Sequence, residues 1–167
     1  MKRRKIVPLT HPHGRVLDFG VKTQLDQPWR EAIEKAGPDT PTSDEVWGAG
    51  INFEPIGTGL WEGRLVLINF PRHGGWRDAT DWAEEHNLVS ADPRRVFSFW
   101  GERKYILPTD ECIIVPEVVS PEDCTIDGVR QACSLWLYDL APRARISPIY
   151  RFSTGGLEYW FAFRKNE

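Results

Sequence analysis

Residues 65–86 of the chain read LVLINFPRHGGWRDATDWAEEH and join a strand, a glycine-rich loop and a helix. The segment opens with the longest aliphatic run in the sequence, which predicts a strand buried on both faces. Its second half repeats Ala79, Trp82 and Ala83 at helical spacing, so these side chains share one face of an amphipathic helix. The segment therefore predicts that helices and strands occur together in one domain.

Two further helices are predicted, one on each side of this segment. Residues 26–36 place apolar side chains at helical spacing, and a Gly-Pro pair ends the helix. The Asp-Pro pair at residues 92–93 is typical of a helix start, and Gly101 is expected to end that helix. Residues 96–100 would also suit a strand, but the helix is favoured. For the helix in the middle, Asp78 is the predicted N-cap.

The remainder of the chain is typical of β-structure. An early strand is predicted at residues 15–21. After residue 104, strands are predicted at 104–107, 112–119, 131–138, 144–152 and 157–164. Short turns join the last three, which predicts a C-terminal β-meander, and the Asp-Gly pair at residues 127–128 is a strong hairpin signal. The sequence thus predicts a single α+β domain over residues 1–167, with two or three helices packed on a mostly antiparallel sheet.

Composition and charge exclude several classes of protein. Apolar residues make up 41% and charged residues 27% of the chain, which excludes a disordered or fibrous protein. No apolar run approaches the length of a membrane helix. The net charge of −3 gives no general attraction for nucleic acid or anionic membranes, so neither partner is expected. Residues 1–10 form a basic N-terminal tail that is either solvated or able to touch phosphate.

The cysteines and the N-terminal residues indicate a compartment. Three cysteines are an odd number without paired spacing, which favours reduced thiols over a disulfide framework. The apolar run at residues 6–9 is too short for the hydrophobic region of a signal peptide. The sequence therefore predicts a cytoplasmic protein, and it carries no signal for an oligomeric state.

The loop at residues 71–78 is the strongest candidate for a ligand site. A buried strand, two glycines and a helix start allow backbone N–H groups to point at an anion, and nearby arginines add positive charge. The pattern matches neither a Walker loop nor a dinucleotide fingerprint, so an ordinary glycine turn is the alternative. The predicted ligand-binding residues are Arg72, His73, Gly74, Gly75 and Trp76.

Metal-binding and catalytic patterns are weak in this sequence. His11 and His13 could offer two imidazoles to a metal. A metal site needs three or four converging ligands, and only His73 or Asp18 suggests itself as a further one. The cysteines lack the spacing of a structural zinc site, and no serine lies in a nucleophile elbow. We therefore expect no metal, no cofactor and no catalytic residue.

Eight tryptophans are unusually many for 167 residues. Three of them lie on apolar helical faces and are expected in the core. Four others lie in glycine-rich loops or on the polar side of a strand, where exposed rings would suit sugars, bases or protein partners. The alternative is that the loops fold back and bury these rings. The predicted partner surface consists of Trp47, Trp61 and Trp160, and Trp76 belongs to the ligand loop.

These features favour a non-catalytic binding or interaction protein, and a protein partner is favoured over a small polar ligand. The alternative is a small enzyme that acts on an anionic or phosphorylated substrate through the loop at residues 72–75. An enzyme site should bring His73 and a second titratable side chain into one cleft. A binding surface should instead leave Trp47, Trp61 or Trp76 exposed around an apolar patch.

Two segments together suggest a family. Residues 76–97 form a Trp- and Ala-bearing helix, a short loop and a second capped helix, and residues 159–164, YWFAFR, close the predicted β-meander. In this combination the chain resembles C-type-lectin-like domains of the formylglycine-generating-enzyme kind. It lacks that family's cysteine framework, the Glu-Pro-Asn and Trp-Asn-Asp calcium motifs and a cysteine pair for copper-dependent oxidation. The resemblance therefore implies the fold, and it implies neither calcium-dependent sugar binding nor the enzyme activity.

Overall fold

The computed structural model describes residues 8–36, 55, 57–72, 74–103, 111–115, 125–126, 129–138, 141–148 and 159–166. Within these residues lie three helices: α1 (Trp29–Ala36), α3 (Trp76–Glu85) and α4 (Pro93–Arg103). The strands are β1 (Arg15–Gln24), β2 (Leu60–Asn69), β3 (Leu88–Ser90), β4 (Cys112–Val115), β5 (Thr125–Ile126), β6 (Val129–Tyr138), β7 (Ala141–Pro148) and β8 (Tyr159–Lys165). None of these helices has the length and hydropathy needed to cross a membrane.

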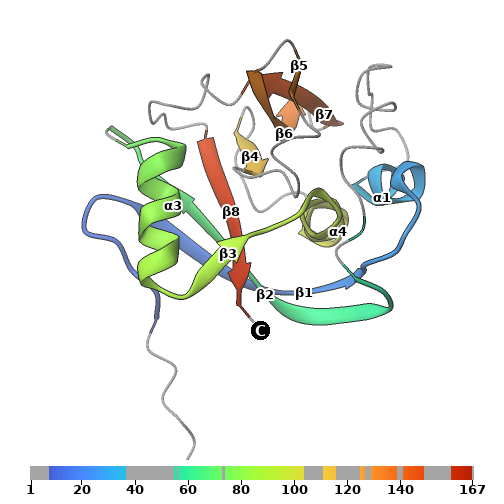
Figure 1. Ribbon diagram of the computed structural model, residues 1–167, viewed down its shortest axis with the longest axis horizontal. Coiled ribbons are helices and arrows are strands. Elements are labelled where there is room, and N and C mark those ends of the chain that lie inside the picture. The colour runs from blue at the N-terminus through green and yellow to red at the C-terminus, as the bar shows by residue number, and fades with distance from the viewer. Residues whose placement is uncertain are drawn as a thin grey trace, which may run out of the picture.

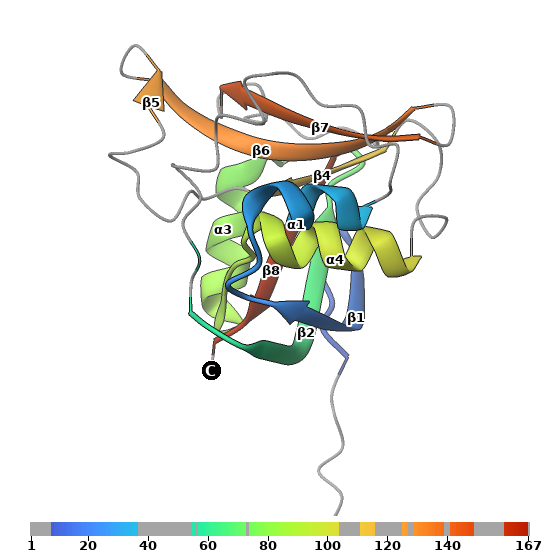
Figure 2. The ribbon, with the colours of Figure 1, turned by 90° about the vertical axis from the view of Figure 1, so that its right-hand side faces the viewer.

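The strands form one sheet in the order β1-β2-β8-β4-β6-β5, with β3 also paired to β8 and β7 to β6. All pairs are antiparallel except β4 with β8. Figure 1 shows α3 on one side of β8 and α4 with α1 on the other. In Figure 2, α1 and α4 lie between β1 and β2 below and β6 and β7 above. The protein is an α+β fold with helices packed on a mostly antiparallel sheet, as the sequence predicts.

Alternate residues of the central strands point into two separate cores. In β2, Leu65 and Leu67 pack with α1 and α4, whereas Val66 and Ile68 pack with α3. This arrangement confirms that the aliphatic run of β2 is buried on both faces, because helices cover each side of the sheet. The same alternation in β8 sends Trp160 toward α4, with 2% of its surface exposed.

The predicted C-terminal meander is wrong in its last strand. Strands β6 and β7 do form an antiparallel hairpin, but β8 leaves β7 and lies between β2 and β4. Both faces of β8 therefore need apolar residues, and its central residues 160–163 are all buried. The short turns between the predicted strands favour pairing of β8 with β7. The apolar residues on both faces of β8 instead suit a strand in the centre of the sheet.

Helix α4 confirms the predicted helix start and corrects the predicted end. The Asp92 side chain accepts a hydrogen bond from the backbone N–H of Arg95 at 3.3 Å, as an N-cap does. The helix continues through Gly101 to Arg103. A Cβ at Gly101 would overlap the backbone carbonyl oxygen of Lys35 in α1, so this glycine allows two helices to approach closely.

The start of α4 holds a buried ion pair. The side chains of Asp92 and Arg95 pair with each other, and both residues are buried. The guanidinium of Arg95 also lies 4.3 Å from the centroid of the Trp61 ring. Trp61 belongs to β2 instead of a loop, and this contact with α4 covers its ring.

Candidate functional site

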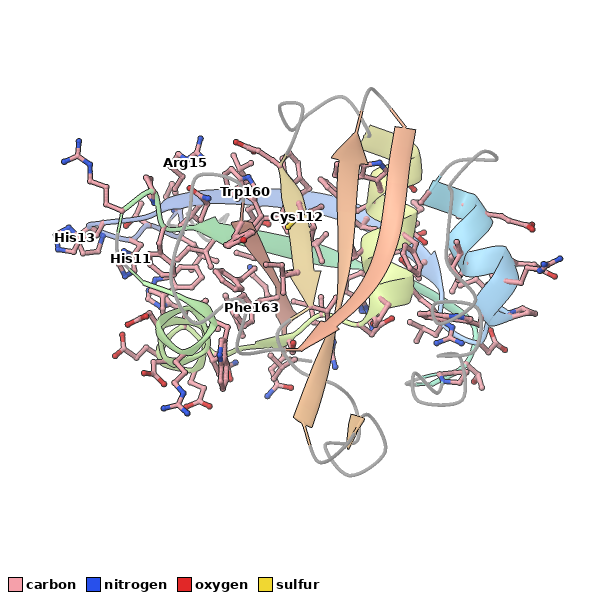
Figure 3. All side chains as sticks on the ribbon, turned by 90° about the horizontal axis from the view of Figure 1, so that it is seen from above. His11, His13, Arg15, Cys112, Trp160 and Phe163 are labelled. Carbon is pink, nitrogen blue, oxygen red and sulfur yellow. The ribbon has the colours of Figure 1, made fainter. Side chains whose placement is uncertain are left out.

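A cleft of about 740 Å³ opens between the residues that precede β1 and the loop that follows β2. We call residues 8–14 the strap. The cleft is lined by His11, Pro12, His13, Gly14, Arg15, Phe70, Pro71, Arg72, Gly74 and Asp78. Figure 3 shows His11 and His13 at one end of the molecule, with Arg15 and then Trp160 further along the sheet. The register of β1 on β2 creates this juxtaposition, because Arg15 pairs with Asn69 just before the loop.

The strap is attached to the body through a few specific contacts. The indole N–H of Trp82 in α3 donates to the carbonyl oxygen of Thr10 at 3.2 Å. The His11 ring meets the Phe70 ring edge-on, with 4.9 Å between centroids. Within the strap, the Gly14 N–H donates to the His11 carbonyl at 3.4 Å and closes a tight turn. These contacts place the His11 imidazole on the wall of the cleft.

The hydrogen bonding of His11 fixes where its ring carries a proton. The backbone N–H of His13 donates to Nδ1 of His11 at 3.0 Å, so the neutral ring carries its proton on Nε2. Burial lowers the pKa of His11 below its ordinary value, and the nearby imidazoles of His13 and His86 lower it further. His11 is therefore a neutral hydrogen-bond donor near pH 7, and its Nδ1 lone pair is not available to act as a base.

Arg15 is held in a fixed orientation at the cleft. Its guanidinium carbon lies 4.8 Å from the Trp160 ring centroid, and its Nε–H donates to Oδ1 of Asn69 at 2.9 Å. Its terminal nitrogen lies 3.6 Å from Oε1 of Glu111. The Trp160 indole N–H donates to the other Glu111 oxygen at 2.6 Å. Trp160 thus supports an arginine at the site, although the sequence placed it on an exposed partner surface.

The glycine loop contributes only part of the predicted site. Arg72 is exposed and lines the cleft together with Gly74. The Gly75 N–H donates to Oδ2 of Asp78 at 2.8 Å, so this amide is already satisfied. Asp78 therefore lies inside helix α3 and accepts from the residue before the helix, whereas the sequence predicted it as the N-cap. Trp76 is half-buried and does not line the cleft.

Two of the three tryptophans of the predicted partner surface are buried instead of exposed. Trp61 is 6% exposed and Trp160 is 2% exposed, because an arginine from a neighbouring element covers each ring. Trp47 lies outside the described residues, and so does His73 of the ligand loop. Sequence reasoning missed Arg15 as a site residue, and it considered His11 and His13 only as metal ligands. Their one signal in the sequence is the clustering of basic and imidazole side chains at residues 11–15.

The side chains of the cleft are suited to binding an anion. Two arginines and an imidazole N–H can donate hydrogen bonds, and the carboxylate in the lining, Asp78, already accepts one from the Gly75 amide. Within the described part of the chain, no three histidine, cysteine, aspartate or glutamate side chains are placed to hold a metal ion.

Replacing Gly74 with alanine is expected to destabilise the protein by about 1–3 kcal/mol. Gly74 has a φ of +113°, and a Cβ there would lie 2.9 Å from the Phe70 ring. Gly59→Ala is the matched control, since Gly59 has a φ of +81° and no atom within 4 Å of a Cβ. Urea unfolding should show a larger loss for Gly74→Ala, and equal losses would mean that the Phe70 contact is relieved without cost.

Comparisons of the chain with protein-family models, with curated proteins and with solved structures find no match. The resemblance to C-type-lectin-like domains therefore stays a prediction.

Proposed function

We propose that the protein is a non-catalytic binding protein that holds a small anionic ligand in the cleft between the strap and the loop after β2. The observation that carries this proposal is the fixed guanidinium of Arg15, which lines the same cleft as Arg72 and the His11 imidazole. An arginine held in place before binding loses little conformational entropy when a ligand arrives. Its planar fork suits the oxygens of a carboxylate, phosphate or sulfate group.

Size and charge together support a small ligand. A cleft of about 740 Å³ falls within the range that holds metabolite-sized molecules. Arg72 is exposed and can approach a ligand held by Arg15. A protein partner has less support than the sequence suggested, because Trp61 and Trp160 offer almost no exposed ring surface. The buried thiol of Cys112 is compatible with the reducing, cytoplasmic compartment that the sequence predicts.

Acid–base catalysis by His11 in this cleft has a specific obstacle. General acid–base catalysis needs a side chain that can take up and release a proton. The Nδ1 atom of His11 already accepts the His13 N–H, and its Nε2 carries the proton of the neutral ring. His11 is therefore suited to donate a hydrogen bond that orients an anion, and this favours binding over catalysis in the cleft.

Replacing Arg72 with alanine is expected to weaken anion binding by about tenfold, because a hydrogen bond to a charged group is lost. The probes are sulfate, inorganic phosphate, pyrophosphate and adenosine monophosphate, and affinity is measured by isothermal titration calorimetry. Arg15→Ala should weaken binding at least as much, since Arg15 is already oriented. Arg77→Ala is the matched control, because Arg77 is a nearby arginine that stacks on Trp76 outside the cleft.

The control variant should change affinity by less than about threefold, as expected for a charge that acts only at a distance. Affinity that is undiminished in both Arg15→Ala and Arg72→Ala would place the anion elsewhere. Absence of binding by every probe at millimolar concentration would overturn the proposal.

A further inference from the structure

His11 separates two cavities and joins the strap to the body. One cavity is the anion cleft, and a second of about 440 Å³ lies on the α3 side of the strap. Both are lined by His11 and Pro12. Among the residues that the structure describes, the titratable and charged side chains that line these cavities with His11 come from three places. They are His13 and Arg15 from the chain next to it, Arg72 from the loop after β2, and Asp78, Asp81 and Glu85 from α3 with His86 directly after that helix.

We propose that His11 is a pH-sensitive latch, which holds the strap closed while its imidazole is neutral and releases it on protonation. The effect on ligand affinity rests on the proposed function, whereas the latch itself can be observed in the protein without ligand. The chemical basis is the hydrogen bond that Nδ1 of His11 accepts from the backbone N–H of His13.

Protonation would replace this acceptor by a donor. The His13 N–H points at Nδ1 from 3.0 Å, and an imidazolium has no lone pair there. Two N–H groups would then face each other, so the hydrogen bond inside the turn must break. The edge-on contacts of the ring with Phe70 and Trp82 also place it against apolar surface, which disfavours a charge.

The carboxylates near His11 do not reverse its preference for the neutral form. Asp78 and Glu85 favour the imidazolium, but burial and the imidazoles of His13 and His86 outweigh them, so the pKa of His11 lies below 6.5. The folded protein therefore binds the His11 proton less readily than the unfolded chain does. The stabilisation from neutral His11 is complete above about pH 6.5 and is lost as the pH falls through the lower pKa of the folded state.

Release of the strap would remove a wall of the anion cleft. Four consecutive lining residues, 11–14, belong to the strap. Its other ties to the rest of the protein include the hydrogen bond from the Trp82 indole to the Thr10 carbonyl. Ligand affinity should therefore fall in acid. An anion site that merely gains charge from protonated histidines would bind more tightly in acid.

His11→Asn is the variant that separates the two behaviours. An asparagine Oδ1 takes the place of the imidazole Nδ1 and accepts the same hydrogen bond two residues along, as in an Asx turn, without titrating. The first measurement is hydrogen-exchange protection of the residue 13 amide by NMR, corrected for the intrinsic rate, between pH 7.5 and 4.5. We expect protection to fall about tenfold in the wild type, as for the loss of one hydrogen bond, and less than about twofold in His11→Asn.

The His13→Asn variant serves as the control for the other imidazole of the turn. Its protection should still fall in acid, with the midpoint at a higher pH than in the wild type, because the His13 imidazole no longer lowers the pKa of His11. The second measurement is the affinity for sulfate, whose charge does not change over this pH range. This affinity should fall in acid for the wild type and for His13→Asn, and it should not fall for His11→Asn. If the amide keeps its protection at pH 4.5 in the wild type, the latch is wrong. If protection falls in acid but sulfate does not bind at any pH, the latch stands and the proposed function fails.

Discussion

Replacing Asp92 with alanine is expected to lower the free energy of unfolding by about 3–5 kcal/mol, because it leaves a buried arginine without its counter-charge. Asp92 is 5% exposed and its partner Arg95 is 3% exposed, so water cannot replace the lost carboxylate. The same substitution removes the hydrogen bond from the Arg95 N–H that caps α4. Urea unfolding followed by tryptophan fluorescence measures the loss.

Two further variants separate the cap from the charge. Asp92→Asn keeps an oxygen for the capping hydrogen bond and removes only the negative charge. The double variant Asp92→Ala with Arg95→Met removes both charges and keeps an unbranched side chain against the Trp61 ring. We expect the double variant to recover much of the stability lost in Asp92→Ala. A double variant as unstable as the single one would show that the stranded charge is not the cause.

Replacing Gly101 with alanine is expected to destabilise the protein by about 2–3 kcal/mol through overpacking between α4 and α1. The sign of the change in stability tests the close approach of the two helices. In the interior of an unobstructed helix, alanine stabilises by up to about 1 kcal/mol relative to glycine, so a loss of stability would indicate overpacking. At Gly101 the new Cβ would overlap the Lys35 carbonyl oxygen, and backbone atoms cannot move aside as a flexible side chain can.

Thermal unfolding of Gly101→Ala should show a lower midpoint than the wild type. Gly20→Ala is the matched control, since a Cβ at Gly20 in β1 would meet no atom within 4 Å. The control should change the midpoint little in either direction. A higher midpoint for Gly101→Ala would mean that α1 and α4 do not approach as closely as described.

The parts of the fold that local patterns determine could be predicted from the sequence. The Asp-Pro pair at residues 92–93 correctly indicated the start of α4, and the aliphatic run of β2 correctly indicated burial on both faces. Each signal depends on residues close together in the chain. The place of β8 could not be predicted in this way, because it depends on pairing with β2 and β4.

In the candidate site, too, only the features that depend on neighbouring residues could be predicted from the sequence. The glycine loop drew attention to Arg72 and Gly74, which do line the cleft. The opposite wall comes from the strap, and no local pattern links residue 11 to residue 72. Their meeting requires the register in which Arg15 pairs with Asn69. Local alternation predicts Trp160 on a polar face, because the elements that cover it are distant in sequence.

The central position of β8 also has a consequence for how the chain folds. The side-chain amide of Asn69 donates to the carbonyl of Tyr159, ninety positions away, and the whole β2–β8 ladder closes loops of similar length. Such pairing is slow to form, because the entropy of a long loop must be lost before the contacts are gained. Until β8 arrives, one edge of β2 has no partner strand, and exposed edges of this kind associate with other chains. Strand β2 therefore depends on a distant segment of the chain for its pairing. Chaperones that shield nascent chains would protect β2 until β8 has formed.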